Sequence, residues 1–230
     1  MGSIIQFPPP VEVAELGKGF YTISEAARLA RVPLGTLRYW RKECILLETI
    51  EWEDEEEERE IGYTFDTLVY MRLLRMLRDN DVSLRKAVEG VSSLTGRFGP
   101  PGPAWEQARL FVFGSDLYVH AKDEWETTVA TRSGQRSVDA LFGDEFQRLR
   151  DRADALLVPR EFQRRVEIDP AKRNGHPVMV GTTVPTSLVY EMEKAGYNVS
   201  EIHREYPFLP LASVKAAQRF EHYLDLHIAA

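Results

Sequence analysis

The stretch that most constrains the fold is residues 21–42, YTISEAARLARVPLGTLRYWRK, which predicts two short helices joined by a tight turn. Thr22 or Ser24 can cap the first helix, and Glu25 stands where the acid of a capping box reaches back to Thr22. Small and apolar residues then recur at helical spacing on one face. They are Ile23, Ala26, Ala27 and Ala30.

Arg28 and Arg31 point away from this apolar face of the first helix. The second helix is predicted at residues 36–42, after a turn in which the apolar Val32 is expected to be buried. The second helix turns Leu37 and Trp40 inward, and its other face is polar and basic. That outer face carries Thr36, Arg38, Tyr39, Arg41 and Lys42.

Such a basic helix suits the major groove of DNA. An arginine can bind a guanine edge through two hydrogen bonds, while hydroxyl groups and lysine hold phosphates. The five outer residues are therefore the first candidate DNA-binding set. The alternative is an ordinary surface helix whose bases are solvated.

Charge is distributed unevenly along the 230 residues, whose formal net charge is −7. Residues 51–60 contain eight acids and one base, so this stretch alone carries −7 and the remaining chain is balanced. The acidity is therefore local and does not argue against DNA binding elsewhere. The single cysteine, Cys44, excludes an internal disulfide and a cysteine-based zinc cluster. No stretch resembles a membrane span or a secretory signal, so we expect a cytoplasmic protein.

The residues that follow predict a hairpin and two further helices, which complete a domain at residues 20–98. Residues 45–51 and 61–65 read as strands on either side of the acidic run, and Asp66 is expected to cap the next helix. The apolar face of that helix is strongly periodic. It comprises Leu68, Met71, Leu74 and Leu77, and a further helix starts at residues 81–83.

Five sets of residues, in this order, resemble the winged helix-turn-helix domain of the MerR regulators. They are Tyr21-Thr-Ile-Ser-Glu-Ala-Ala, Val32, Thr36-Leu-Arg-Tyr-Trp, Gly62-Tyr63 and residues 73–84. The resemblance implies that Thr36, Arg38 and Tyr39 face DNA and that the hairpin lies beside the DNA backbone. Because DNA repels carboxylates, we expect the acidic hairpin not to make that contact. It either faces a basic partner or is a solvated loop.

An arm is predicted before this domain, at residues 1–19, and three more segments are predicted after it. Residues 99–104 form a proline- and glycine-rich linker, and residues 105–160 form a central unit. In that unit a hairpin is expected at residues 110–120, a further strand at 127–131, and a long amphipathic helix from Ser137 or Asp139 through Leu157.

The last segment, residues 161–230, predicts three helices, and the second and third make another helix-turn-helix. Its last helix supplies a second candidate DNA-binding set: Lys215, Gln218, Arg219 and His222. This segment resembles a homeodomain-like family associated with VapBC-type antitoxins. The resemblance is carried by Ile168-Asp-Pro, the motif from Gly175 to Pro185, Gly196-Tyr-Asn-Val-Ser-Glu-Ile and Tyr206-Pro-x-Leu.

Signals for catalysis are absent from the sequence. The acidic run is the only dense supply of carboxylates, but it has no glycine turns or carbonyl ligands suited to a divalent cation. His222 and His227 are five residues apart, which misses the spacing of three or four that places two ligands on one helical face. We find no phosphate-binding glycine loop or nucleophile elbow. The sequence predicts a binding protein, with no enzyme activity, metal or cofactor.

The expected fold class is α+β and mainly helical. Three hypotheses remain for the function. In the first, the chain is an antitoxin that neutralises a cognate ribonuclease-type toxin and represses its own promoter. In the second, it is a MerR-like regulator with a C-terminal sensing or dimerisation domain. In the third, the acidic run serves an enzyme. Because repressors read palindromic sites in pairs, we also expect a homodimer, formed through the central hairpin and long helix.

Overall fold

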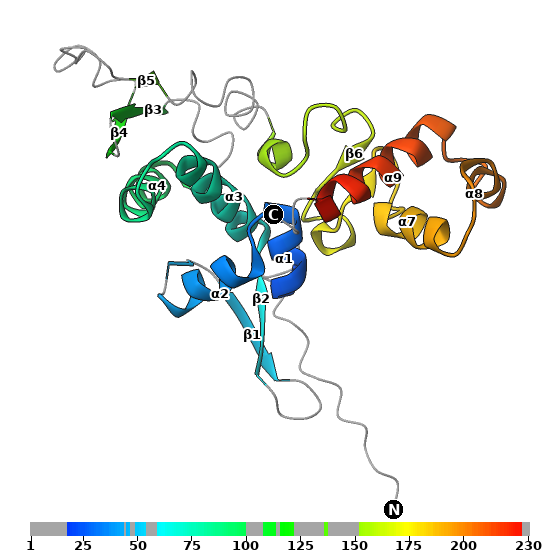
Figure 1. Cartoon of the computed structure of the whole chain (residues 1–230), viewed down its shortest axis with the longest axis horizontal. Coiled ribbons are helices and arrows are strands. Elements are labelled where there is room, and N and C mark those ends of the chain that lie inside the picture. The colour runs from blue at the N-terminus through cyan, green and yellow to red at the C-terminus, as the bar shows by residue number, and fades with distance from the viewer. Residues whose placement is uncertain are drawn as a thin grey trace, which may run out of the picture.

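The structure is a computed structural model that describes residues 18–43, 45–46, 49–53, 59–99, 108–113, 116–121, 136–137 and 152–226. Helices dominate these residues and three small antiparallel sheets accompany them, which confirms the predicted mainly helical α+β class. Figure 1 shows the helices of residues 23–98 on one side of the molecule and those after residue 185 on the other. Nearly all of the predicted arm and linker, Cys44 and the tip of the acidic hairpin lie outside the described residues.

Helix α1 (Ile23–Ala30) begins with the predicted capping box. The Thr22 hydroxyl accepts a hydrogen bond from the Glu25 amide, and the Glu25 carboxylate accepts one from the Thr22 amide at 2.8 Å. Arg31 ends the helix in the left-handed conformation, with φ at 55°. The turn therefore closes at Arg31 and returns the chain toward the second helix.

Helix α2 (Leu34–Lys42) starts two residues earlier than predicted, directly after Pro33. Proline fixes its own φ, here −52°, at a value that suits a helix start, so the helix needs no side-chain cap to begin there. Leu37 and Trp40 are buried as predicted. Helices α1 and α2 thus form the expected helix-turn-helix.

The hairpin pairs β1 (Thr49–Glu53) with β2 (Arg59–Tyr63), so that Thr49 lies opposite Tyr63 and Glu53 lies opposite Arg59. Tyr21 exchanges two backbone hydrogen bonds with Tyr63, at 3.0 and 2.8 Å. The base of the hairpin is consequently fixed to the entry of α1.

Helices α3 (Phe65–Asp79) and α4 (Leu84–Phe98) complete the N-terminal domain. The cap of α3 is Thr64, whose hydroxyl accepts from the Thr67 amide, so the prediction of Asp66 as the cap was wrong by two residues. A hydroxyl is as good an acceptor for a first-turn amide as a carboxylate, and here it comes earlier in the chain. Ser83 caps α4, at the predicted start.

The central unit contains β3 (Ala108–Phe113), β4 (Asp116–Ala121) and β5 (Arg136–Ser137), in the order β4-β3-β5. The predicted hairpin is confirmed. The strand predicted at 127–131 and most of the predicted long helix lie outside the described residues.

At its C-terminal end the long helix is not formed. Arg152 is extended, with φ at −149°, and a short 3-10 helix, η4 (Ala153–Leu156), follows it. The Asp154 carboxylate binds the Arg152 guanidinium at 2.5 Å and accepts the Ile168 amide at 2.9 Å. The bond from the Ile168 amide reaches the C-terminal segment, and together with the local Arg152 bond it favours the tight turn over a continuous helix.

The C-terminal segment begins with β6 (Val166–Glu167) paired to β7 (Val178–Met179), with the 3-10 turn η5 (Arg173–Gly175) between them. The three predicted helices follow. They are α7 (Thr186–Lys194), α8 (Val199–Glu205) and α9 (Leu211–Leu226).

One large hydrophobic core joins the two ends of the chain. It contains residues of α1, α3 and α4 together with Leu156, Phe162, Phe220 and Leu224. A second, smaller core lies inside the three-helix unit, around Ile202 and Val214. The C-terminal domain is therefore packed against the helix-turn-helix rather than tethered to it.

Candidate nucleic-acid interface

Helix α2 presents the first candidate set on one surface. Arg38, Arg41 and Lys42 are exposed, Tyr39 is 52% exposed, and Thr36 is half-buried at the first turn. Leu37 is fully buried and Trp40 is 2% exposed, so the inner face anchors the helix in the core. The structure therefore brings all five residues to the outer part of α2, with three full positive charges free to meet phosphate or base edges.

Arg41 of α2 acts electrostatically on Tyr63, the last residue of the hairpin. Burial raises the pKa of Tyr63, at the end of β2, and the positive charge of Arg41 acts in the opposite direction. Arg41 therefore lies near the base of the hairpin, where a wing would follow the DNA backbone beside the reading helix. The tip of the hairpin, residues 54–58, lies outside the described residues.

Helix α1 binds the C-terminal domain through Arg28, which lies away from the apolar face of the helix. Its guanidinium donates to Glu221 at 2.6 Å and to Asp225 at 2.7 and 2.9 Å. The Glu221 side chain is only 2% exposed, and its second oxygen accepts from the Thr186 hydroxyl. A buried carboxylate needs such a partner, so Arg28 ties α1 to both α9 and α7.

Arg31 makes a second connection from the turn of the helix-turn-helix. It is 6% exposed, and its guanidinium donates to the Leu156 carbonyl and to the Tyr223 hydroxyl at 2.6 Å. Arg28 and Arg31 do point away from the apolar face of α1, as the sequence indicated. Arg31 is buried and Arg28 is half-buried because α9 covers that side, which periodicity within a single helix cannot reveal.

The second candidate set is divided by the packing of α9. Lys215, Arg219 and His222 are exposed, whereas Gln218 is 9% exposed and faces the interior. Arg219 pairs with Glu161 at 2.9 Å, and His222 contacts Glu193 at 3.0 Å. Of its three exposed members, Lys215 alone has no such acidic neighbour among the described residues. The exposed basic face of α2 is thus the better-organised cationic surface.

Together, α1, α2 and the hairpin define a winged helix-turn-helix domain, the class of domain with which transcription regulators bind DNA. Residues 21–93 match the profile of the MerR helix-turn-helix family of regulatory proteins. Residues 166–220 match a second family, described as a protein of unknown function, DUF433. These spans fall within the predicted domains 20–98 and 161–230.

Among solved structures, the chain is similar to the crystal structure of Rv2018 from Mycobacterium tuberculosis. The two are 18% identical, the alignment covers 86% of this chain and 96% of that one, and the TM-score is 0.56. This likeness shows a shared fold over most of the chain. No curated protein matches the sequence.

The described residues contain no group of three or more His, Cys, Asp and Glu side chains able to hold a metal ion. None of their helices is both long and apolar enough to cross a membrane.

Proposed function

We propose that this chain is a DNA-binding antitoxin that represses its own promoter and neutralises a ribonuclease-type toxin. The observation that carries the DNA-binding half is the exposed basic face of α2, whose inner face is anchored in the core by Leu37 and Trp40. A reading helix fixed in this way can enter a major groove without first becoming ordered.

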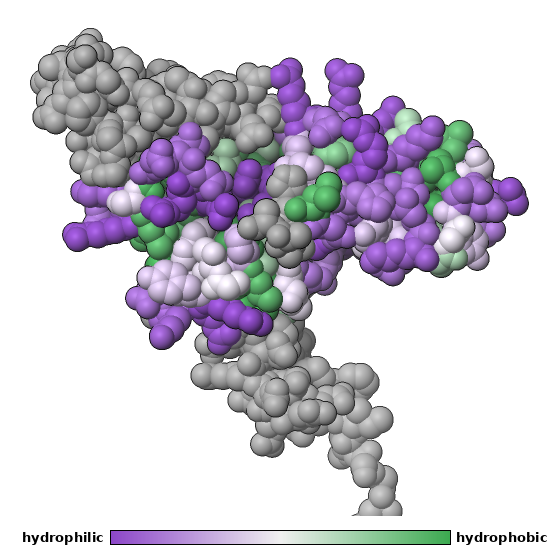
Figure 2. Space-filling model, viewed as in Figure 1, coloured by the Kyte–Doolittle hydropathy of each residue, from purple (hydrophilic) through white to green (hydrophobic). Residues whose placement is uncertain are grey.

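The observation that supports a protein partner lies at the other end of the molecule. Residues 207–212, PFLPLA, are six consecutive apolar residues of which only Leu209 is buried. Phe208 is 64% exposed and Leu211 44% exposed. Figure 2 shows hydrophobic residues gathered at this end, where α8 meets α9. Contiguous exposed apolar segments are uncommon unless they bind something.

The test has two arms. In a gel-shift titration, the purified chain should bind a fragment of its own promoter in preference to unrelated DNA. When the open reading frame beside its gene is expressed alone, growth should stop, and co-expression of this chain should restore it. The antitoxin half would be contradicted if growth stays arrested on co-expression, or if the adjacent open reading frame alone does not affect growth. Promoter binding in the gel shift would then support a repressor without a toxin.

A second candidate keeps the DNA binding without a toxin. In this alternative the C-terminal domain senses a ligand or forms the dimer, as in a MerR-like regulator. The specific observation in its favour is the tight packing of that domain against α1, through Arg28 and Arg31. The co-expression experiment separates the two candidates.

A further inference from the structure

A cavity of about 540 Å³ lies at the seam between α1 and the C-terminal domain. Its walls come from both sides: Glu25 belongs to α1, and the other lining residues belong to the C-terminal segment. They are Arg173, Asn174, His176, Pro185 and Ser187. The volume lies within the range of small-molecule sites, but the lining is polar.

The loop that forms one wall is fixed to the entry of α1. The Phe20 amide donates to the Asn174 carbonyl at 2.9 Å, and the Tyr21 hydroxyl donates to the Gly175 carbonyl at 2.7 Å. Burial raises the pKa of the Tyr21 phenol, so it remains a donor at neutral pH. The cavity therefore exists before any ligand arrives.

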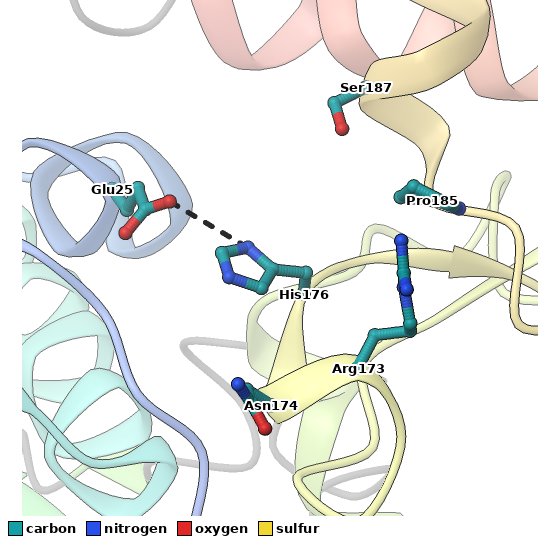
Figure 3. Close-up of a pocket in the computed structure, with 6 residues that line it drawn as sticks. All are labelled: Glu25, Arg173, Asn174, His176, Pro185 and Ser187. Carbon is teal, nitrogen blue, oxygen red and sulfur yellow. Dashed lines mark ion pairs between the residues drawn. The ribbon is translucent and has the colours of Figure 1, made fainter. Parts of the chain in front are cut away.

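Donors predominate on the loop side of this cavity. Figure 3 shows Arg173, His176 and Ser187 turned toward the same space, with Glu25 across from them. Within the described part of the chain, neither the Arg173 guanidinium nor the Ser187 hydroxyl has a hydrogen-bond partner. Both groups are exposed and available to a ligand.

The carboxylate of Glu25 is already occupied. One oxygen accepts from the Thr22 amide and hydroxyl, at 2.8 and 2.9 Å, and the other lies 3.7 Å from His176 Nδ1. The free donors of Arg173 and Ser187 favour a ligand group that accepts hydrogen bonds, and the guanidinium of Arg173 favours one that carries negative charge.

We propose that the seam cavity binds a small molecule through a phosphate or carboxylate group, held by Arg173, Ser187 and His176. Since the walls belong to two domains, such a ligand binds only the docked arrangement and stabilises it. This site is independent of the toxin and of the DNA-facing surface of α2.

The experiment is calorimetric titration of the full chain at constant ionic strength with inorganic phosphate, glycerol 3-phosphate and succinate. The first two probes against the third distinguish a phosphate from a carboxylate ligand. Arg173→Gln should weaken binding by roughly tenfold or more, because a charge-assisted hydrogen bond is lost. Glu25→Gln keeps a capping-box residue yet removes the repelling charge, so it should tighten binding by roughly twofold to fivefold.

Arg164→Gln is the matched control, since Arg164 is exposed but does not line the cavity. It should leave the affinity unchanged. The proposal is overturned if the wild type binds none of the three probes, if Arg173→Gln binds as well as the wild type, or if Arg164→Gln weakens binding equally.

Discussion

At the residue scale, the DNA-binding proposal rests on side chains that do little for the fold. Arg38 and Arg41 are exposed on α2, while Leu37 and Trp40 anchor the same helix. Exchange of the outer arginines should therefore change binding and leave stability within about 0.5 kcal/mol.

We predict that Arg38→Ala with Arg41→Ala weakens promoter binding by about 1–3 kcal/mol for each lost base contact, or lowers the salt slope where phosphate contacts are lost. Gel-shift titrations at two salt concentrations measure both effects. Arg164→Ala, an exposed arginine remote from α2 in sequence, is the control. Unchanged binding by the double variant would refute the assignment and direct attention to Lys215, Arg219 and His222, the exposed members of the α9 set.

Asp225 gives a second prediction at this scale. Burial alone would raise its pKa, but hydrogen bonds from Tyr190 and Arg28 outweigh burial and hold the pKa of Asp225 below its usual range. Their stabilisation is therefore present above about pH 3.9, the ordinary value, and is lost as the pH falls through the lower folded value. The stability deficit of Asp225→Asn in urea unfolding should shrink over that acidic range.

Tyr190 should show the opposite dependence. Its hydrogen bond to Asp225, followed by burial, raises the pKa of Tyr190 to about 12. The protonated phenol therefore contributes below about pH 10 and loses its contribution as the pH rises through the folded value. The deficit of Tyr190→Phe should be constant near neutrality and shrink above pH 10, and a deficit that persists there would contradict this account.

At the element scale, the loop of η5 holds the seam between the domains. Gly175 has φ at 83°, and a Cβ placed there would lie 2.0 Å from the Tyr21 hydroxyl oxygen. Gly181 has nearly the same φ, 78°, but open space around it. The two glycines therefore separate a steric clash from backbone strain.

We predict that Gly175→Ala lowers the free energy of unfolding by about 2 kcal/mol or more beyond the loss in Gly181→Ala, because only the first adds a clash to the strain. Urea unfolding of the two variants measures the difference. Addition of Tyr21→Phe to Gly175→Ala should recover part of it. Equal losses in the two glycine variants would show that Tyr21 does not restrict this loop.

The sequence predicted elements better than the contacts between them. Caps and periodicity located α1, α4 and the three C-terminal helices, because these signals are local. The prediction missed Thr64 as the cap of α3 because Asp66, two residues later, also has a side chain that can cap a helix. It missed the early start of α2 because that helix begins after Pro33 without a side-chain cap. The contacts of Arg28 and Arg31 could not be predicted, since their partners Glu221 and Tyr223 lie more than 190 residues away.

At the scale of the whole molecule, the large core contains residues from both ends of the chain. We therefore predict that the N-terminal and C-terminal domains unfold in one cooperative transition. Arg28→Ala leaves Glu221 buried without its cationic partner, at a cost of about 3–5 kcal/mol, and should separate the transition into two. Calorimetry measures both. Two transitions in the wild type would mean that the shared core does not couple the domains.

Assembly on DNA is the last prediction. A single α2 reads only a few base pairs, and two-fold repressors gain specificity by placing two reading helices about one DNA turn, roughly 34 Å, apart. We therefore expect a homodimer, with the central β3–β4 hairpin in or near the contact. Sedimentation at tens of micromolar protein should give twice the chain mass of 26.4 kDa. Phe208→Asp tests the exposed apolar residues at the α8–α9 turn. If this substitution alone abolishes the dimer, the two-fold contact lies at that turn, and the segment is not free to bind a toxin. A monomer at every concentration would require a single-copy mode of DNA binding.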